Sequence, residues 1–190
     1  MLQVERNIII PTDMGFDVTD HVRARKGDHV TKRMTDGRFL KAGTVPINSL
    51  GQVALIRKED GVRWGLAKGH VDVEDAIHFA DDFVQALRLT AGRETAEETG
   101  KIVELDSFLN TEMSDKADGH NSIIYYFGAR IVGQTGKRSE KETILVDVED
   151  APGLVVPELA GIVTLAIERW ATSYDLQDRI PSQGLMSVAV

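Results

Sequence analysis

The chain has 190 residues, and its 22 Lys and Arg are outnumbered by 30 Asp and Glu, which gives a formal net charge of −8. An apolar share of 42% with 27% charged residues is typical of one soluble globular domain and excludes collagen-like, coiled-coil and disordered chains. The absence of cysteine excludes a disulfide framework, a thiolate metal site and a cysteine nucleophile.

The first forty residues show no firm pattern of secondary structure. Glu5 and Arg6 interrupt the apolar start, so we read no signal peptide there. From Arg23 to Lys41, seven Lys or Arg oppose two Asp, a local net charge of +5 against −13 for the rest of the chain. This segment is either a solvated surface or a basic rim that attracts a polyanionic substrate, with Arg23 and Arg25 among its contacts.

Strand patterns become clear after residue 43. A strand over 52–58 leads through an Asp60-Gly61 hairpin turn into a second strand over 62–66. After a helical stretch that ends at Gly100, further strands are predicted over residues 102–109, 122–132 and 142–148.

Pro157 opens the last predicted helix, since proline is tolerated in a first turn. Its apolar residues follow helical spacing and form one buried stripe, namely Leu159, Ile162, Val163, Ala166 and Trp170. No run reaches the roughly 18 apolar residues of a membrane span. Strands interleaved with two main helices predict an α/β fold, an α/β/α sandwich with a mixed β-sheet.

Three glutamates share one face of the helix that ends at Gly100. Glu94, Glu97 and Glu98 stand at i, i+3 and i+4, where like charges cost a few tenths of a kcal/mol per pair. Apart from Lys101 at the helix end, we find no basic residue at i+4 that would offset them. A hard divalent cation would turn this repulsion into attraction. The alternative is an exposed acidic helix face.

The motif around these glutamates resembles a family signature. Residues 64–70 read W-G-L-A-K-G-H and residues 93–100 read R-E-T-A-E-E-T-G. Together they resemble the signature of the Nudix hydrolase superfamily, G-x5-E-x7-R-E-U-x-E-E-x-G-U, where U is aliphatic. The matching residues are Gly69, Arg93, Glu94, Glu97, Glu98 and Gly100. The resemblance extends over about residues 43–170.

The sequence departs from this signature in three ways. Gly69 and Arg93 are 24 positions apart, ten more than in the signature, and this insertion leaves its first glutamate unassigned. Thr95 and Lys101 stand at aliphatic positions, and Ala67 stands where many members have proline.

The insertion also constrains the helix. The resemblance implies that the Gly69 carbonyl lies at the metal, beside the glutamates. A straight helix from Asp75 to Glu97 would span ~33 Å, whereas the chain from Gly69 to Asp75 reaches only ~20 Å, so the helix must break if Gly69 keeps this role. We therefore expect an inserted helical piece near Glu74–Phe83 that folds back before the signature helix starts around Ala86.

The resemblance implies a Nudix pyrophosphohydrolase that cleaves a nucleoside diphosphate linked to another group, with Mg²⁺ or Mn²⁺ as cofactor. Arg93, Glu94, Glu97 and Glu98 would be catalytic, and Arg93 would orient a neighbouring carboxylate. The metal ligands would be the Gly69 carbonyl, Glu97 and Glu98, with Glu94 as a further ligand or the base. Lys68 would contact a phosphate. In several branches of the family a further glutamate outside the signature binds metal or serves as the base, and Glu140 and Glu142 are the candidates here. We interpret His70 and His120 as surface histidines.

The expected partner is a small-molecule nucleotide or polyphosphate, and we expect neither a membrane nor nucleic acid. The W-G-L-x-K-G-H segment looks like the corresponding segment of dinucleoside polyphosphate hydrolases and diphosphoinositol polyphosphate hydrolases. RNA 5′-pyrophosphate and ADP-sugars are the alternative substrates. The alternatives are a non-catalytic Nudix-fold nucleotide-binding or regulatory module and an acidic interaction domain without metal.

We expect a cytoplasmic protein, and a homodimer is one possible assembly. Its expected parts are an N-terminal extension packed on the domain (1–40), a Nudix hydrolase domain (41–175) and a C-terminal tail (176–190).

Overall fold

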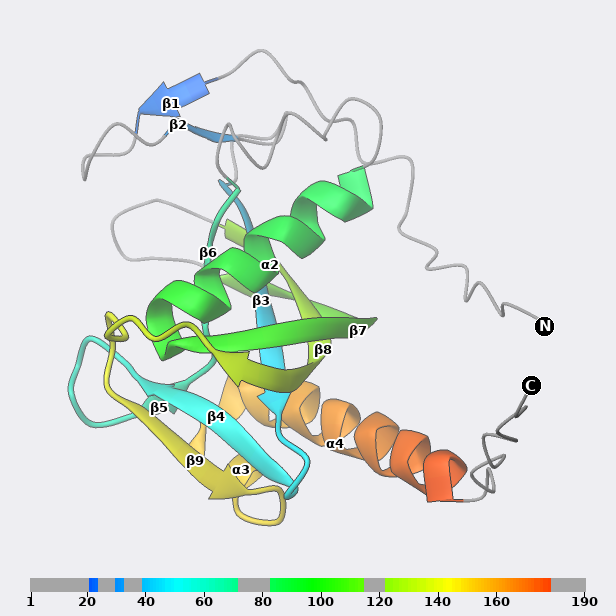
Figure 1. The fold of residues 1–190 in the computed structure, drawn as a ribbon. Helices are drawn as coiled ribbons and strands as arrows, with labels where there is room; N and C mark the ends of the chain where they lie inside the picture. The colour runs from blue at the N-terminus through cyan, green and yellow to red at the C-terminus, as the bar shows by residue number, and fades with distance from the viewer. Residues whose placement is uncertain (1–20, 24–29, 33–38, 72–82, 115–121, 179–190) are drawn as a thin grey trace, which may run out of the picture.

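A computed structural model describes residues 21–23, 30–32, 39–71, 83–114 and 122–178 of the chain (Figure 1). Its strands are β1 (His21–Arg23), β2 (Val30–Lys32), β3 (Phe39–Ile47), β4 (Gln52–Arg57), β5 (Trp64–Gly65), β6 (Lys68–His70), β7 (Lys101–Ser114), β8 (Ser122–Gln134) and β9 (Thr143–Asp147). Its helices are α2 (Phe83–Thr99), α3 (Ala151–Leu154) and α4 (Pro157–Asp178).

Within the described residues, seven strands form one mixed sheet in the order β5-β4-β3-β8-β7, with β6 also paired to β3 and β9 to β4. The central strands β3 and β8 run parallel, from Phe39 opposite Ser122 to Ile47 opposite Arg130. All other strand pairs are antiparallel. Strands β1 and β2 form a separate two-stranded sheet.

The two long helices cover opposite faces of this sheet (Figure 1). Strand β3 contributes to both faces because successive side chains alternate. Leu40 and Ala42 pack with Leu87 and Ala91 of α2 in one core. Val45 and Ile47 pack in the other core, together with the predicted apolar stripe of α4. This arrangement confirms the predicted α/β/α sandwich.

Most predicted elements are found within a few residues of their expected bounds, but β3 was not predicted. Helix α2 is described from Phe83, ahead of the expected Ala86, and it is unbroken across Phe83–Leu87. The expected inserted piece lies almost wholly outside the described residues. Helix α4 runs to Asp178, so it crosses the expected boundary between residues 175 and 176. No helix in the described part of the chain has the length and apolar character needed to cross a membrane.

Candidate functional site

Helix α2 carries the three glutamates and is anchored to the central strand. The hydroxyls of Thr44 in β3 and Thr95 in α2 are hydrogen-bonded at 2.7 Å in the buried interior. The helix stops at Gly100, whose φ of 69° is the left-handed conformation expected of a helix-ending glycine. These two features set the position of α2 along its axis and therefore the height of its carboxylates over the sheet.

Strand β6 brings Gly69 directly under Glu94. Gly69 pairs with Ala42 of β3, which belongs to the core against α2. A Cβ added at Gly69 would lie 1.9 Å from Cδ of Glu94. The carboxylate can occupy this position only because residue 69 has no side chain. One residue earlier, the Lys68 backbone N–H donates to Oε2 of Glu98 at 3.0 Å.

Two cations compensate the charges of the three glutamates, and one of them, Lys141, was not expected from the sequence. Arg93 Nη1 donates to Glu94 Oε1 and to Glu97 Oε2, both at 2.9 Å, while its Nη2 donates to the His70 carbonyl at 3.1 Å. The Nζ of Lys141 forms an ion pair with Oε1 of Glu98. The contacts of Arg93 agree with its expected pairing with a neighbouring carboxylate. The search for basic residues at i+4 missed the second cation, because Lys141 reaches the helix from a distant loop.

The glutamates differ in burial. The Glu98 side chain is 7% exposed and that of Glu94 14%, whereas Glu97 is 44% exposed. Burial, together with the charges of Glu98 and Glu97, raises the pKa of Glu94 to about 7, against the lowering effect of Arg93. Charging Glu94 is therefore costly unless another cation is present.

These residues fit a hard divalent cation by the chemistry of their donors. Carboxylate oxygens are the protein ligands that Mg²⁺ prefers, and two of them meet the backbone of β6 where Gly69 removes the steric obstacle. Within the described residues, no group of three or more His, Cys, Asp or Glu side chains is already arranged to hold a metal ion. Arg93 and Lys141 hold the carboxylates in their present directions.

The other predicted site residues lie elsewhere or outside the described part. Glu142 is exposed and makes a two-point ion pair with Arg57, with N–O distances of 2.7 and 2.9 Å. This hydrogen bonding lowers the pKa of Glu142. Arg23 lies in β1, where only the backbone is described, and Arg25 and His120 fall outside the described residues.

Sequence reasoning missed Lys141. It belongs to the charged run 137–142, which has the composition of a solvated loop. Its contact with Glu98 joins residues 43 positions apart, so no local spacing could reveal it. His70 contributes its carbonyl, and its ring packs edge-on against Phe39 at 5.3 Å between centroids.

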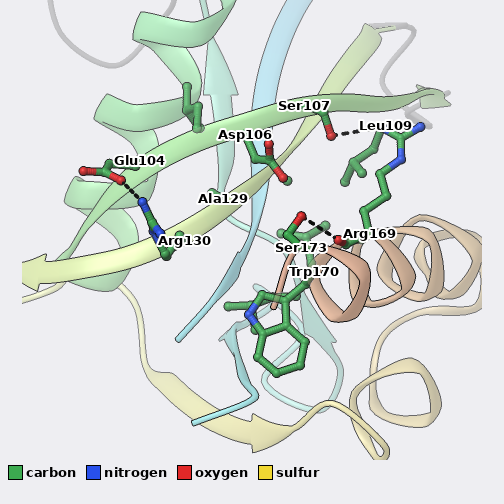
Figure 2. Close-up of a pocket in the computed structure, with 14 residues that line it drawn as sticks. Glu104, Asp106, Ser107, Leu109, Ala129, Arg130, Arg169, Trp170 and Ser173 are labelled. Carbon is green, nitrogen blue, oxygen red and sulfur yellow. Dashed lines mark hydrogen bonds and ion pairs between the residues drawn. The ribbon is translucent and has the colours of Figure 1, made fainter. Parts of the chain in front are cut away.

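A cavity of about 240 Å³ lies on the other face of the sheet, between the second half of α4 and strands β7 and β8 (Figure 2). Trp170 and Arg169 of α4 line it, and Arg130 pairs with Glu104 at its rim (Figure 2). Arg169 Nη1 donates to Ser107 Oγ at 3.0 Å. This cavity shares no residue with the glutamate cluster, so it is not part of the candidate site.

Solved structures of Nudix proteins resemble this chain. An Ap4A hydrolase from C. elegans matches with a TM-score of 0.54 and 19% identity, over 70% of this chain and 98% of its own. A MutT protein from Methanosarcina mazei matches at 0.52 and 18%, over 70% and 95%. A Nudix-family hydrolase from Clostridium perfringens matches at 0.52 and 14%, over 70% and 98%.

No family model and no curated protein matches the sequence. The structural likeness, at identities below 25%, establishes the class of fold. The chain has the fold of the Nudix hydrolases, and the resemblance seen in its sequence is confirmed at that level.

Proposed function

We propose that this protein is a metal-dependent hydrolase of a pyrophosphate link in a nucleoside diphosphate joined to another group. One observation carries the proposal: in a chain with the Nudix fold, the carboxylates of Glu94 and Glu98 meet the backbone of Lys68 and Gly69. Hydrolysis of a phosphoric anhydride needs metal ions that neutralise the negative phosphate oxygens, and clustered carboxylates are the groups that hold such ions.

Glu94, Glu97, Glu98 and the Gly69 carbonyl would hold Mg²⁺ or Mn²⁺. The bound ion would supply charge for the phosphate oxygens and lower the pKa of the attacking water. Arg93 keeps Glu94 and Glu97 in place through its two hydrogen bonds. Glu94 serves either as a further ligand or as the base that accepts the proton of the water.

The favoured substrate is a dinucleoside polyphosphate or a similar polyphosphate compound. The C. elegans structure of similar fold is an Ap4A hydrolase. Lys68 flanks Gly69, and Arg23 and Arg25 belong to the basic segment, so these three residues would bind the phosphate chain. We propose that the protein is cytoplasmic, and a homodimer is compatible with this function.

A second candidate is a non-catalytic Nudix-fold module that binds nucleotides. It is favoured by the charge compensation in the cluster, because Arg93 and Lys141 together pair with all three glutamates. Losing one partner of a buried ion pair leaves an uncompensated charge, so these pairs have a structural reason to persist apart from any chemistry.

The deciding experiment is a substrate panel assayed for phosphate and nucleotide release with Mg²⁺ and with Mn²⁺. The panel contains dinucleoside polyphosphates, nucleoside triphosphates, ADP-sugars, diphosphoinositol polyphosphates and 5′-triphosphorylated RNA. We expect turnover that requires the divalent ion and disappears in Glu98→Gln. Nucleotide binding with no turnover of any compound would favour the second candidate.

A further inference from the structure

The loop before β9 is fastened to the end of α2, directly beside the glutamates. The backbone N–H groups of Glu140 and Lys141 donate to the carbonyls of Glu97 and Glu98 at 3.0 and 3.3 Å. The Thr143 hydroxyl also donates to the Glu98 carbonyl, at 3.4 Å. These bonds use carbonyls that the helix leaves open at its C-terminus. They hold the Lys141 backbone next to Glu98.

Both carboxylate oxygens of Glu98 are engaged. Oε1 pairs with Lys141 Nζ and Oε2 accepts the Lys68 N–H. Because the Glu98 side chain is only 7% exposed, its charge needs a partner in the metal-free protein. A divalent cation that binds Glu98 through Oε1 must therefore take this oxygen from Lys141.

Lys141 is able to give way, whereas Arg93 is fixed. The Lys141 side chain is 35% exposed and its ammonium sits on a flexible four-carbon stem, so it can turn into solvent while the backbone bonds persist. The guanidinium of Arg93 is held by Glu94, Glu97 and the His70 carbonyl together. Displacing Arg93 would leave three acceptors without their donor.

We infer that Lys141 is an internal counter-ion that competes with the divalent cation for Glu98 and thereby sets the metal affinity of the site. This inference rests on the proposed metal-dependent function. Lys141 acts through Glu98, so it is a positioning residue rather than a catalytic one. Metal binding exchanges one cation for another at the same oxygen.

The test measures Mn²⁺ binding to the substrate-free full chain by isothermal titration calorimetry. If the ion pair is closed about 90% of the time, Lys141→Met binds Mn²⁺ about tenfold more tightly than the wild type. Lys141→Arg keeps the charge and the donors, and should bind within about threefold of the wild type. Lys141→Gln replaces the methionine variant if that variant does not fold.

Lys137→Met is the matched control. It removes the same charge from the same loop, and Lys137 is exposed and in no ion pair within the described residues. We expect its Mn²⁺ affinity to rise by less than about threefold, because an exposed charge acts only through screened long-range attraction. Equal affinities of the Lys141→Met and Lys137→Met variants, or weaker binding by the former, would overturn the inference and leave the metal site intact. No Mn²⁺ binding by wild type or variants would overturn the proposed metal site as well.

Discussion

At Gly69, a single missing Cβ decides where a carboxylate can lie. The nearest atoms to an added Cβ all belong to the Glu94 side chain, the closest at 1.9 Å. Such an overlap is relieved when the flexible side chain turns away, without movement of the backbone. The glycine therefore controls the direction of Glu94 more than the stability of the fold.

Gly69→Ala should lose activity by on the order of a hundredfold or more, because Glu94 is pushed out of the cluster. The free energy of unfolding should fall by only about 1 kcal/mol, since one Arg93 hydrogen bond is lost. Steady-state kinetics together with urea unfolding measure both effects. Full activity in a folded Gly69→Ala protein would contradict the role of this glycine.

Glu98→Gln tests the most buried carboxylate. Glutamine keeps the shape and the acceptor for the Lys68 N–H but loses the charge that faces Lys141. We expect activity to fall by about a hundredfold or more. The metal-free protein should lose about 1.5–3 kcal/mol of stability, the contribution of a hydrogen bond to a charged group. Circular dichroism establishes that the variant is folded, and retained turnover would remove Glu98 from the site.

At the scale of elements, β3 shows why the central strand was not predicted. It is buried on both faces and so lacks the alternation of a half-exposed strand. It also contains Lys41, Gly43 and Pro46, residue types that are depleted in strands or confined to edges. Residues 41–43 of β3 pair with β6 and Ile47 pairs with β4, so Pro46 lies between these two pairings. Tertiary pairing therefore overrides local preference in this strand.

Helix α2 offers a stabilising substitution. A Cβ at Gly92 would meet nothing within 4 Å. Because glycine in a helix interior is less favourable than alanine, Gly92→Ala should raise the free energy of unfolding by about 0.5–1 kcal/mol.

The control for Gly92→Ala is Gly61→Ala. Space is equally open at Gly61, but its φ is 69°, so alanine there should lower stability. The urea concentration at the midpoint of unfolding measures the stability of both variants, provided that the m-value is unchanged. A loss of stability in Gly92→Ala would contradict this prediction.

For the molecule as a whole, a divalent cation should stabilise the native state. A ligand that binds only the folded protein adds about 2.7 kcal/mol at a hundredfold excess over Kd. Calorimetric unfolding at increasing Mn²⁺ should therefore show a rising Tm, and Glu98→Gln should show a smaller rise. NaCl at matched ionic strength controls for screening. An unchanged transition in Mn²⁺ would refute the metal site.

The Nudix-like sandwich was expected from the order of strands and helices and from the resemblance to the Nudix signature. Local spacing was enough to place three glutamates on one helix face and to predict the helix end at Gly100. These features depend on residues within one or two turns of each other, and local spacing determines such contacts. Only the tertiary structure showed that Gly69 lies under Glu94 and that Lys141 pairs with Glu98. Those contacts cross an insertion and a 43-residue separation, and they depend on strand register and loop placement, which no local pattern encodes.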